Sequence, residues 1–424
     1  MNLKENIEYK NKEMENISLK NKKLKSKLNK YKRQSYEVVK KINEILLKIN
    51  PDKMSNFEEL KINKEQELKY EQGMFIGNLA YGRREGKGIV YYNVGDRYDG
   101  EWINNKREGK GIMHFNSGDR YEGKWISDKM EGKGIMNYNN GNRYEGDWRN
   151  NKMEGRGIMN YNIGDIYEGE WRSGVKEGKG IMYYFNGHRY EGDWKNDLKE
   201  GKGIMLYKNN NKYDGDWIND KREGKGIMFY NNGDKYEGEW IGDKREGKGI
   251  FYFNNGKIYK GDWKKELMEG IGIFLYNNGD KYEGNLKDGL REGNGTYYYN
   301  DGGRYEGDWI NNKREGKGIM HFNSGERHEG DFKNDEEEGK GILFFNDDER
   351  YEGDFKKGLM EGKGVMLYNN IDKYEGEWIG DKREGKGIYY YINGDKQIGK
   401  FFDDEPIGRH QLFKNNGEII TMTY

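Results

Sequence analysis

The ten tryptophans of this chain all fall on one arithmetic series whose step is 23 residues. Each lies a whole multiple of 23 positions from the next, and the members are Trp102, Trp125, Trp148, Trp171, Trp194, Trp217, Trp240, Trp263, Trp309 and Trp378. A period this strict over so many units predicts a repeat architecture. It decides the fold class before any local pattern is considered.

The repeating unit can be followed from Phe75 onward without an insertion or deletion. It reads Tyr-Glu-Gly-Glu-Trp, a polar stretch, Glu-Gly-Lys-Gly-Ile-Met-x-Tyr, and then Asn-x-Gly-Asp. Of the 64 glycines, 44 fall in three columns of the unit, which begin at Gly77, Gly86 and Gly88. Glycine locked to one phase indicates positions where a side chain does not fit or where φ is positive. These glycines are therefore predicted to be structural.

Each unit is predicted to form two β-strands. In residues 98–102 the alternation places Tyr98, Gly100 and Trp102 on one face and both carboxylates on the other. Residues 111–115 form the second strand, and residues 116–119 form a tight turn into the next unit. The Glu-Gly-Lys-Gly segments are interpreted as strand-to-strand connections. The sequence thus predicts an all-β array: an elongated, twisted, single-layer antiparallel β-meander of 23-residue hairpin units.

A single-layer sheet has no second layer to pack upon, so its stability must come from side chains that lie along its surface. We expect the ring of one unit to lean over the glycine gap of its neighbour, with each aromatic contact contributing about 0.5–1.5 kcal/mol beyond area burial. A second aromatic stripe runs through Tyr92, Phe115 and Tyr138. The sequence leaves open whether both stripes lie on one face.

The composition bounds the class of protein. Hydrophobic residues make up 33% and charged residues 35%, a mix that by itself leans towards disorder, but the aromatic residues occupy fixed phases of the repeat. The formal net charge is zero and there is no cysteine, which excludes disulfides, cysteine zinc sites and thiol catalysis. No run approaches eighteen apolar residues and no signal-like segment begins the chain, so we expect a cytoplasmic protein.

Residues 1–50 are predicted to form an α-helical coiled-coil arm. Positions with the 4-3 spacing of a heptad seam are mostly apolar for more than six heptads. The strongest seam residues are Leu24, Leu28, Tyr31, Val38, Ile42 and Ile45. The seam needs a partner helix, so a homodimer is the simplest inference, with parallel and antiparallel pairings both open. Pro51 ends the helix, and residues 51–74 are predicted to be a linker with a short helix over about 56–70.

The same arm has a second interpretation, because it carries fourteen Lys and Arg against six Glu. Its basic face is a candidate contact for anionic phospholipid. The residues of that face are Lys22, Lys23, Lys25, Lys27, Lys32 and Arg33. Nucleic acid is not expected as a partner, because no recognisable module is present and few aromatic residues interleave the basic ones.

The unit quoted above, with its Gly-Lys-Gly segment and Asn-x-Gly turn at a period of 23, closely resembles the MORN repeat (membrane occupation and recognition nexus). The resemblance covers residues 75–396 as fourteen units, and residues 397–424 are a degenerate fifteenth unit or C-terminal cap. It implies an elongated β-meander with an aromatic-lined groove. Families with such arrays include tethers, cytoskeletal scaffolds and companions of lipid-kinase or methyltransferase domains. Departures from the pattern include Ile271 for Lys, His328 for Tyr, and Phe332 for Trp.

No residue set predicts chemistry. None of the five histidines has metal-ligand spacing to another, and the Gly-Lys-Gly segments lack the spacing of a phosphate loop. Paired carboxylates recur in nearly every unit, which is the opposite of a single tuned site. We therefore expect a non-enzyme with no cofactor and no metal.

The leading hypothesis is a dimeric scaffold or tether whose aromatic groove docks helices or extended segments of cytoskeletal or membrane-associated protein partners. The alternatives are a peripheral phospholipid-binding protein that uses the basic arm, and a regulatory subunit of a separate enzyme. The candidate groove residues are Tyr98, Trp102, Tyr121, Trp125, Tyr144, Trp148, Tyr167, Trp171, Tyr190, Trp194, Tyr213, Trp217, Tyr236 and Trp240.

Overall fold

The computed structural model describes residues 73–369 and 371–424. This part of the chain belongs to two compact units, of which the first ends at Asp128 and the second spans Lys129–Tyr424. Both are built only of β-strands and turns, as the 23-residue period predicts. The predicted coiled-coil arm, with its seam and its basic face, and the predicted linker helix lie outside the described residues.

The described residues of the first unit, 73–128, form five strands, and each pairs antiparallel with the next along the chain. The strands are β1 (Gly73–Ala80), β2 (Arg83–Tyr92), β3 (Arg97–Ile103), β4 (Lys106–His114) and β5 (Arg120–Ile126).

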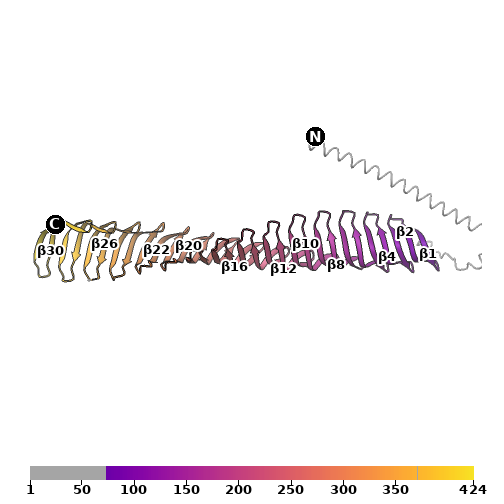
Figure 1. Cartoon of the computed structure of the whole chain (residues 1–424), viewed down its shortest axis with the longest axis horizontal. Coiled ribbons are helices and arrows are strands. Elements are labelled where there is room, and N and C mark those ends of the chain that lie inside the picture. Colours follow the sequence, from indigo (N-terminus) through magenta and orange to yellow (C-terminus); the bar gives the residue numbers. More distant parts are fainter. Residues whose placement is uncertain (1–72, 370) are drawn as a thin grey trace, which may run out of the picture. The chain divides into compact units, whose positions relative to one another are not determined.

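The second unit repeats the same hairpin along an antiparallel sheet, again with every strand paired to its neighbours in sequence. Figure 1 shows its strands side by side in one row that twists along its length. The strands are β6 (Lys129–Asn137), β7 (Arg143–Arg149), β8 (Lys152–Asn160), β9 (Ile166–Arg172), β10 (Val175–Tyr183), β11 (Arg189–Lys195), β12 (Leu198–Leu206), β13 (Lys212–Ile218), β14 (Lys221–Phe229), β15 (Lys235–Ile241), β16 (Lys244–Tyr252), β17 (Ile258–Lys264), β18 (Leu267–Leu275), β19 (Lys281–Lys287), β20 (Leu290–Tyr298), β21 (Arg304–Ile310), β22 (Lys313–His321), β23 (Arg327–Lys333), β24 (Glu336–Phe344), β25 (Arg350–Lys356), β26 (Leu359–Leu367), β27 (Lys373–Ile379), β28 (Lys382–Tyr390), β29 (Lys396–Phe402), β30 (Glu405–Phe413) and β31 (Ile419–Thr423).

The two strands of a hairpin are joined by a two-residue turn, and this corrects the interpretation of the Glu-Gly-Lys-Gly segments as connections. Between β3 and β4 the turn residues Asn104 and Asn105 have φ of 48° and 66°. Positive φ at both positions is the signature of a type I′ turn, which matches the twist of the flanking strands and which asparagine tolerates. The Glu-Gly-Lys-Gly segments instead lie inside the second strand of each hairpin.

That second strand is longer than the first because it contains a bulge. In the β13–β14 hairpin, Gly215 pairs with Gly226 and Trp217 pairs with Arg222, so two extra residues bulge out of β14. Gly224 takes φ of 64° within the bulge. The Asp216 carboxylate accepts a hydrogen bond of 3.0 Å from the backbone N–H of Lys225 and so holds the bulge in place.

Successive 23-residue repeats are joined by the predicted tight turn. In the first compact unit, Gly118 N–H donates to the Phe115 carbonyl at 2.9 Å, and Phe115 N–H donates to the Asp119 carbonyl at 2.9 Å. Gly118 has φ of 96°. This is a three-residue loop in which a turn is closed by a glycine in the left-handed region.

The core of both compact units is a layer of aromatic rings. Each tyrosine ring lies over a pair of glycines that face each other across two strands, such as Gly215 and Gly226. Tyr213 packs edge to face against both Trp217 and Trp240, with ring centroids 5.3 Å apart in each case. Its hydroxyl donates to the Asp216 carbonyl at 3.0 Å. Trp217 donates its indole N–H to the carbonyl of Gly203 in the preceding hairpin at 3.1 Å. The tyrosine thus lies over the glycines of its own hairpin, and the predicted leaning over a neighbour's glycine is confirmed for the tryptophan.

The second aromatic stripe lies on the same face of the sheet, which settles the question that the sequence left open. Phe251 contacts Trp263, with centroids 5.9 Å apart, and also Phe253 of the second stripe, at 4.6 Å. Tyr230, also of the second stripe, contacts Phe251 at 5.9 Å. We call this combined set of tyrosine, tryptophan and flanking methionine or phenylalanine side chains the aromatic layer.

His328 leaves a buried polar atom of this layer without a hydrogen bond in the described part of the chain. It replaces a tyrosine, and its ring contacts Phe332 and Phe355 with centroids 5.4 and 4.5 Å away. Its Nε2 is buried and has no hydrogen-bond partner among the described residues, whereas the hydroxyl of Tyr351 in the next hairpin donates to the Asp354 carbonyl at 3.0 Å. Burial, with a smaller contribution from Arg314, lowers the pKa of His328 to about 4.

We expect His328→Tyr to raise the free energy of unfolding by about 1 kcal/mol, since the new hydroxyl would reach the Asp331 carbonyl. The wild-type chain should also lose stability as pH falls from 6.5 towards 4. Over that range the unfolded histidine binds a proton that the folded one does not, which costs at most about 3 kcal/mol. Thermal unfolding of both proteins between pH 7 and 4 tests this. A constant difference across that range would contradict it.

Candidate partner-binding trough

The aromatic residues predicted to form an open groove are instead enclosed. The tyrosines among them are 0% exposed, and the tryptophans are 1–5% exposed. They make up much of the core, and their places in the two units are Tyr98, Trp102, Tyr121 and Trp125 in the first, and Tyr144, Trp148, Tyr167, Trp171, Tyr190, Trp194, Tyr213, Trp217, Tyr236 and Trp240 in the second.

Cationic side chains cover the outer side of most of these tryptophan rings. The Arg222 guanidinium lies 4.3 Å from the ring centroid of Trp240, and the Lys199 ammonium lies 4.8 Å from that of Trp217. Each stacks on a ring from the following hairpin, which adds a cation–π interaction to the burial. Because all of these rings are 0–5% exposed, the aromatic layer leaves no open ring face for a partner.

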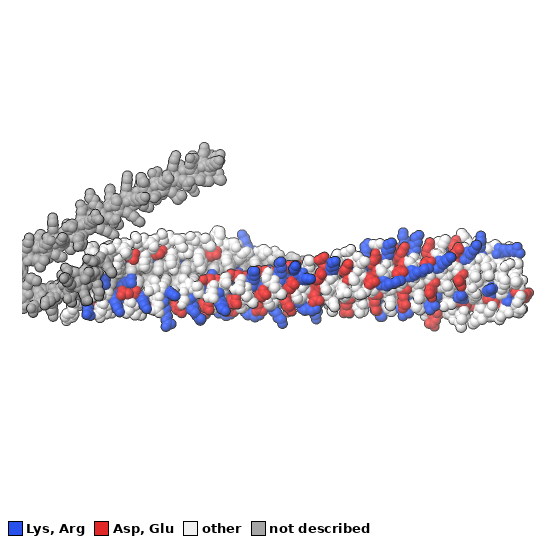
Figure 2. Space-filling model, turned by 180° about the vertical axis from the view of Figure 1, so that it is seen from behind, with Lys and Arg blue, Asp and Glu red and all other residues white. Residues whose placement is uncertain are grey.

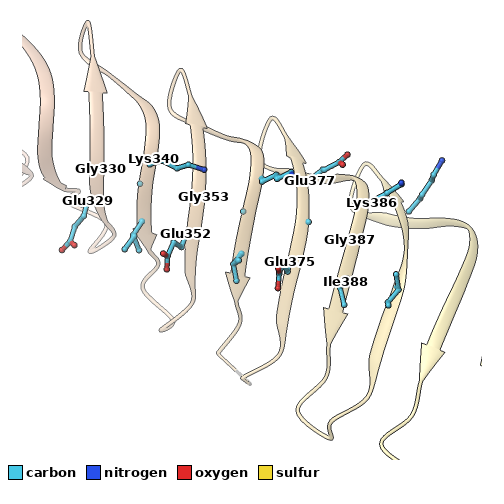
Figure 3. A pocket seen from close by; sticks show the side chains of 18 of the residues that line it. Glu329, Gly330, Lys340, Glu352, Gly353, Glu375, Glu377, Lys386, Gly387 and Ile388 are labelled. Atoms are coloured by element: carbon cyan, nitrogen blue, oxygen red, sulfur yellow. The ribbon is translucent and has the colours of Figure 1, made fainter. Parts of the chain in front are cut away.

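The open surface is the opposite face of the sheet. In the second unit it forms a groove of about 1640 Å³ that is lined by residues from Glu306 in β21 to Gln411 in β30. We call this groove the trough. Its lining includes consecutive glycines of the paired columns, such as Gly330, Gly341 and Gly353, so its floor has no side chains between the two rows (Figure 3).

One side of the trough is a row of isoleucines that alternate with glutamates. Ile342 pairs across the strands with Glu329 on one side and Glu352 on the other, so the three side chains share a face. Each glutamate is held by the basic residue two positions before it: Arg327 lies 3.0 Å from Glu329, and Arg350 lies 3.3 Å from Glu352. These carboxylates therefore do not dominate the charge of the trough.

The other side is a row of basic residues from the Gly-Lys-Gly segments, which we call the lysine row. Within the trough its members are Lys317, Lys340, Lys363, Lys386 and Arg409. Figure 2 shows a continuous line of basic side chains towards the C-terminal end of this unit.

Two members of the lysine row are neutralised by aspartates of the following hairpin. Lys317 lies 2.6 Å from Asp331, and Lys340 lies 2.6 Å from Asp354. The hydrogen bond from Lys340 is the largest cause that lowers the pKa of the Asp354 carboxyl. Both lysines keep most of their side chain exposed, so these pairs are surface ion pairs of about 0–1 kcal/mol each.

Part of the composition of this face could be predicted from the sequence. The alternation in residues 98–102 predicts that the carboxylates lie opposite the rings, and the trough confirms that acidic residues occupy that face. What sequence reasoning missed is the role of the isoleucine and lysine columns. Both belong to the second strand, whose pairing with the first depends on the bulge.

Among the described residues there is no group of three or more His, Asp or Glu that could hold a metal ion. The strongest pKa shifts in the array belong to tyrosines of the aromatic layer, such as Tyr213, whose pKa is raised chiefly by burial. No helix long and apolar enough to span a membrane occurs in residues 73–369 and 371–424.

The family model of the MORN repeat matches this chain in fourteen consecutive units. The matched residues are 75–97, 98–120, 121–143, 144–166, 167–189, 190–212, 213–235, 236–258, 259–281, 282–304, 305–327, 328–350, 351–370 and 374–396. No curated protein matches the chain.

Several solved structures resemble the chain weakly. The SAS-4 (dCPAP) TCP domain of Drosophila melanogaster, in complex with a proline-rich motif of Ana2 (dSTIL), is 18% identical, covers 43% of this chain and 90% of its own, and has a TM-score of 0.22. The TCP10 domain of Danio rerio CPAP, in complex with a peptide of Danio rerio STIL, is 12% identical, with 61% and 99% covered and a TM-score of 0.22. A streptogramin B lyase is 14% identical, with 71% and 96% covered and a TM-score of 0.12. TM-scores this low do not establish a shared fold.

Proposed function

The chain belongs to the MORN repeat family, and on that premise we propose that it is a non-enzymatic scaffold that binds an extended segment of a protein partner along its trough. The observation that carries the proposal is the trough itself. It is a continuous open groove with a floor of paired glycines and charged rows on both sides, on the face of the second unit that the rings do not occupy.

The length of the trough sets the length of the segment that it can hold. Its lining comes from ten consecutive strands, β21 to β30, which at about 4.8 Å per strand gives a length of roughly 45 Å. At about 3.3 Å per residue, the trough accommodates roughly 14 residues of extended chain.

Ile342 offers a direct test. We expect Ile342→Lys to weaken peptide binding at least about tenfold, because a long charged side chain would fill the trough and remove apolar contact. The matched control is Ile227→Lys, in the same column of the repeat but outside the trough; it pairs with Asp214 and Glu237 as Ile342 pairs with two glutamates.

For the measurement, random 14-residue peptides displayed on phage are selected on the full-length chain, resynthesised with a fluorophore and titrated by anisotropy. Loss of affinity with Ile342→Lys and not with Ile227→Lys supports the trough. Equal effects of the two variants, or a failure to select any peptide, would contradict the proposal.

The dimeric part of the proposal rests on the seam in residues 1–50, which includes Leu24, Leu28 and Ile42. Light scattering of the full-length chain measures its mass in solution. A monomeric mass would contradict the proposed dimer, whereas the proposed binding along the trough would still stand. Phospholipid binding by the arm concerns residues outside the described part of the chain and stays a prediction. A role as regulatory subunit of a separate enzyme also stays a prediction. A cytoplasmic site on cytoskeletal or membrane-associated structures is likewise proposed.

A further inference from the structure

The C-terminal end of the trough differs in charge from the rest of it. From Lys386 onward, the lining contains three cationic side chains, Lys386, Lys400 and Arg409, and no carboxylate. All three residues are exposed. The remaining lining there is glycine, isoleucine and Gln411.

Two substitutions in the repeat remove the carboxylates that are present in earlier hairpins. Lys400 stands where Asp331 and Asp354 stand, so Lys386 pairs across the strands with another lysine. Ile398 stands where Glu352 and its counterparts stand and pairs with Ile388. Both acidic rows of the trough therefore end before the last hairpin.

Lys363, one hairpin earlier, still faces a carboxylate, because it pairs across the strands with Glu377. Lys386 and Lys400 face each other instead. In residues 73–369 and 371–424, the ion pairs do not include Lys386, Lys400 or Arg409. Like charges directly opposite each other in a sheet are destabilising. The fold thus keeps three uncompensated cations in a groove, at a cost, and that arrangement suits a ligand that supplies the carboxylates.

We propose that the C-terminal end of the trough recognises acidic side chains of the bound protein segment, spaced three residues apart. This inference rests on the proposed function and specifies the chemistry of its partner. Adjacent members of the lysine row are two strands apart, which is about 9.6 Å. Polyproline II has three residues per turn, so every third side chain lies on one face, and three residues span about 9.3 Å. Carboxylates at every third position of a segment in that extended conformation therefore match the lysine row.

Lys400→Glu tests the inference without opposing the fold, because it restores an acidic residue where earlier hairpins have one and gives Lys386 an opposite charge. We expect it to weaken binding of the selected 14-residue peptides about tenfold, and we expect wild-type binding to weaken as salt rises. The matched control is Lys124→Glu. It gives Lys110 an opposite charge in a similar lysine–lysine pair, that of Lys110 with Lys124, in the first unit. It should leave binding unchanged.

The peptides carry a second readout, since the selected sequences should be enriched in Asp and Glu at intervals of three. Peptides that depend on Ile342 but show no acidic enrichment and no loss with Lys400→Glu would overturn this inference and leave the proposed function standing. If no peptide depends on Ile342, the proposed function fails and this inference fails with it. Vesicles of phosphatidylcholine with phosphatidylserine provide a further arm: binding that Lys400→Glu abolishes there, without any effect on peptides, would assign the cations to lipid and overturn the inference.

Discussion

Replacing Gly226 by alanine is expected to destabilise the hairpins around β14 by about 3 kcal/mol or more. An added Cβ would lie 2.5 Å from Cε2 and Cζ of Tyr213, whose ring lies across the glycine. The ring would have to move, and it would then lose its contacts with Trp217 and Trp240 and its hydrogen bond to the Asp216 carbonyl. Overpacking a tight site typically costs 1–3 kcal/mol, and the lost contacts add to it.

The matched control is Gly174→Ala, at a hairpin turn of the same unit. Gly174 has φ of 92°, and an added Cβ would meet nothing within 4 Å. Its substitution should cost only the backbone strain of a left-handed residue, about 1–2 kcal/mol. Because repeat arrays can open locally, hydrogen exchange of β13, β14 and β15 is the suitable measurement, with denaturant unfolding beside it. If Gly226→Ala were no worse than Gly174→Ala, the ring would not depend on the glycine as described.

Trp217→Ala is expected to destabilise the array by about 3–5 kcal/mol, the usual range for deletion of a buried aromatic side chain. The indole is 2% exposed. Its ring packs against Tyr190 and Tyr213, with centroids 5.3 Å away in both cases, and its N–H donates to the Gly203 carbonyl. The deletion would therefore open contacts within its own hairpin and with the preceding one.

The chain supplies its own conservative control for this position. Phe332 and Phe355 occupy the tryptophan position in later 23-residue repeats, where they are 3% and 5% exposed. They pack edge to face on Tyr305 and Tyr351, respectively. Trp217→Phe should accordingly cost only about 1–2 kcal/mol, mainly for the lost hydrogen bond and volume. Chemical denaturation and hydrogen exchange of β11–β14 measure both variants. An equal loss for alanine and phenylalanine would show that the edge-to-face contacts contribute little.

The 23-residue period and the alternation within each repeat predicted most of the fold. The position of Tyr98, Gly100 and Trp102 on one face, the antiparallel meander and the turn at residues 116–119 follow from those two patterns. The place of the hairpin turn did not follow. The Glu-Gly-Lys-Gly segment resembles a loop in composition, but its first glycine forms part of a β-bulge inside the strand. The two strands are connected by Asn104 and Asn105. The asparagine pair was a signal for a type I′ turn that could have been used.

The binding face was harder to predict, for a physical reason. Alternation assigns side chains to two faces but does not say which face stays open. The aromatic face closes upon itself because Tyr213 and its counterparts lie flat over glycine, and Arg222 and its counterparts cover the rings. The cation cluster of Lys386, Lys400 and Arg409 also requires knowledge of the cross-strand register, which the sequence did not provide.

The claim that a partner lies in the trough is tested most directly by photo-crosslinking. A selected 14-residue peptide with a benzophenone side chain is bound to the full-length chain, irradiated, and the labelled residues are identified by mass spectrometry. Our account places the labels on residues that line the trough between Glu306 and Gln411, such as Ile342, Val365 and Ile388. Labels on the methionines of the aromatic layer, such as Met205 and Met228, or on residues of the first unit would contradict it.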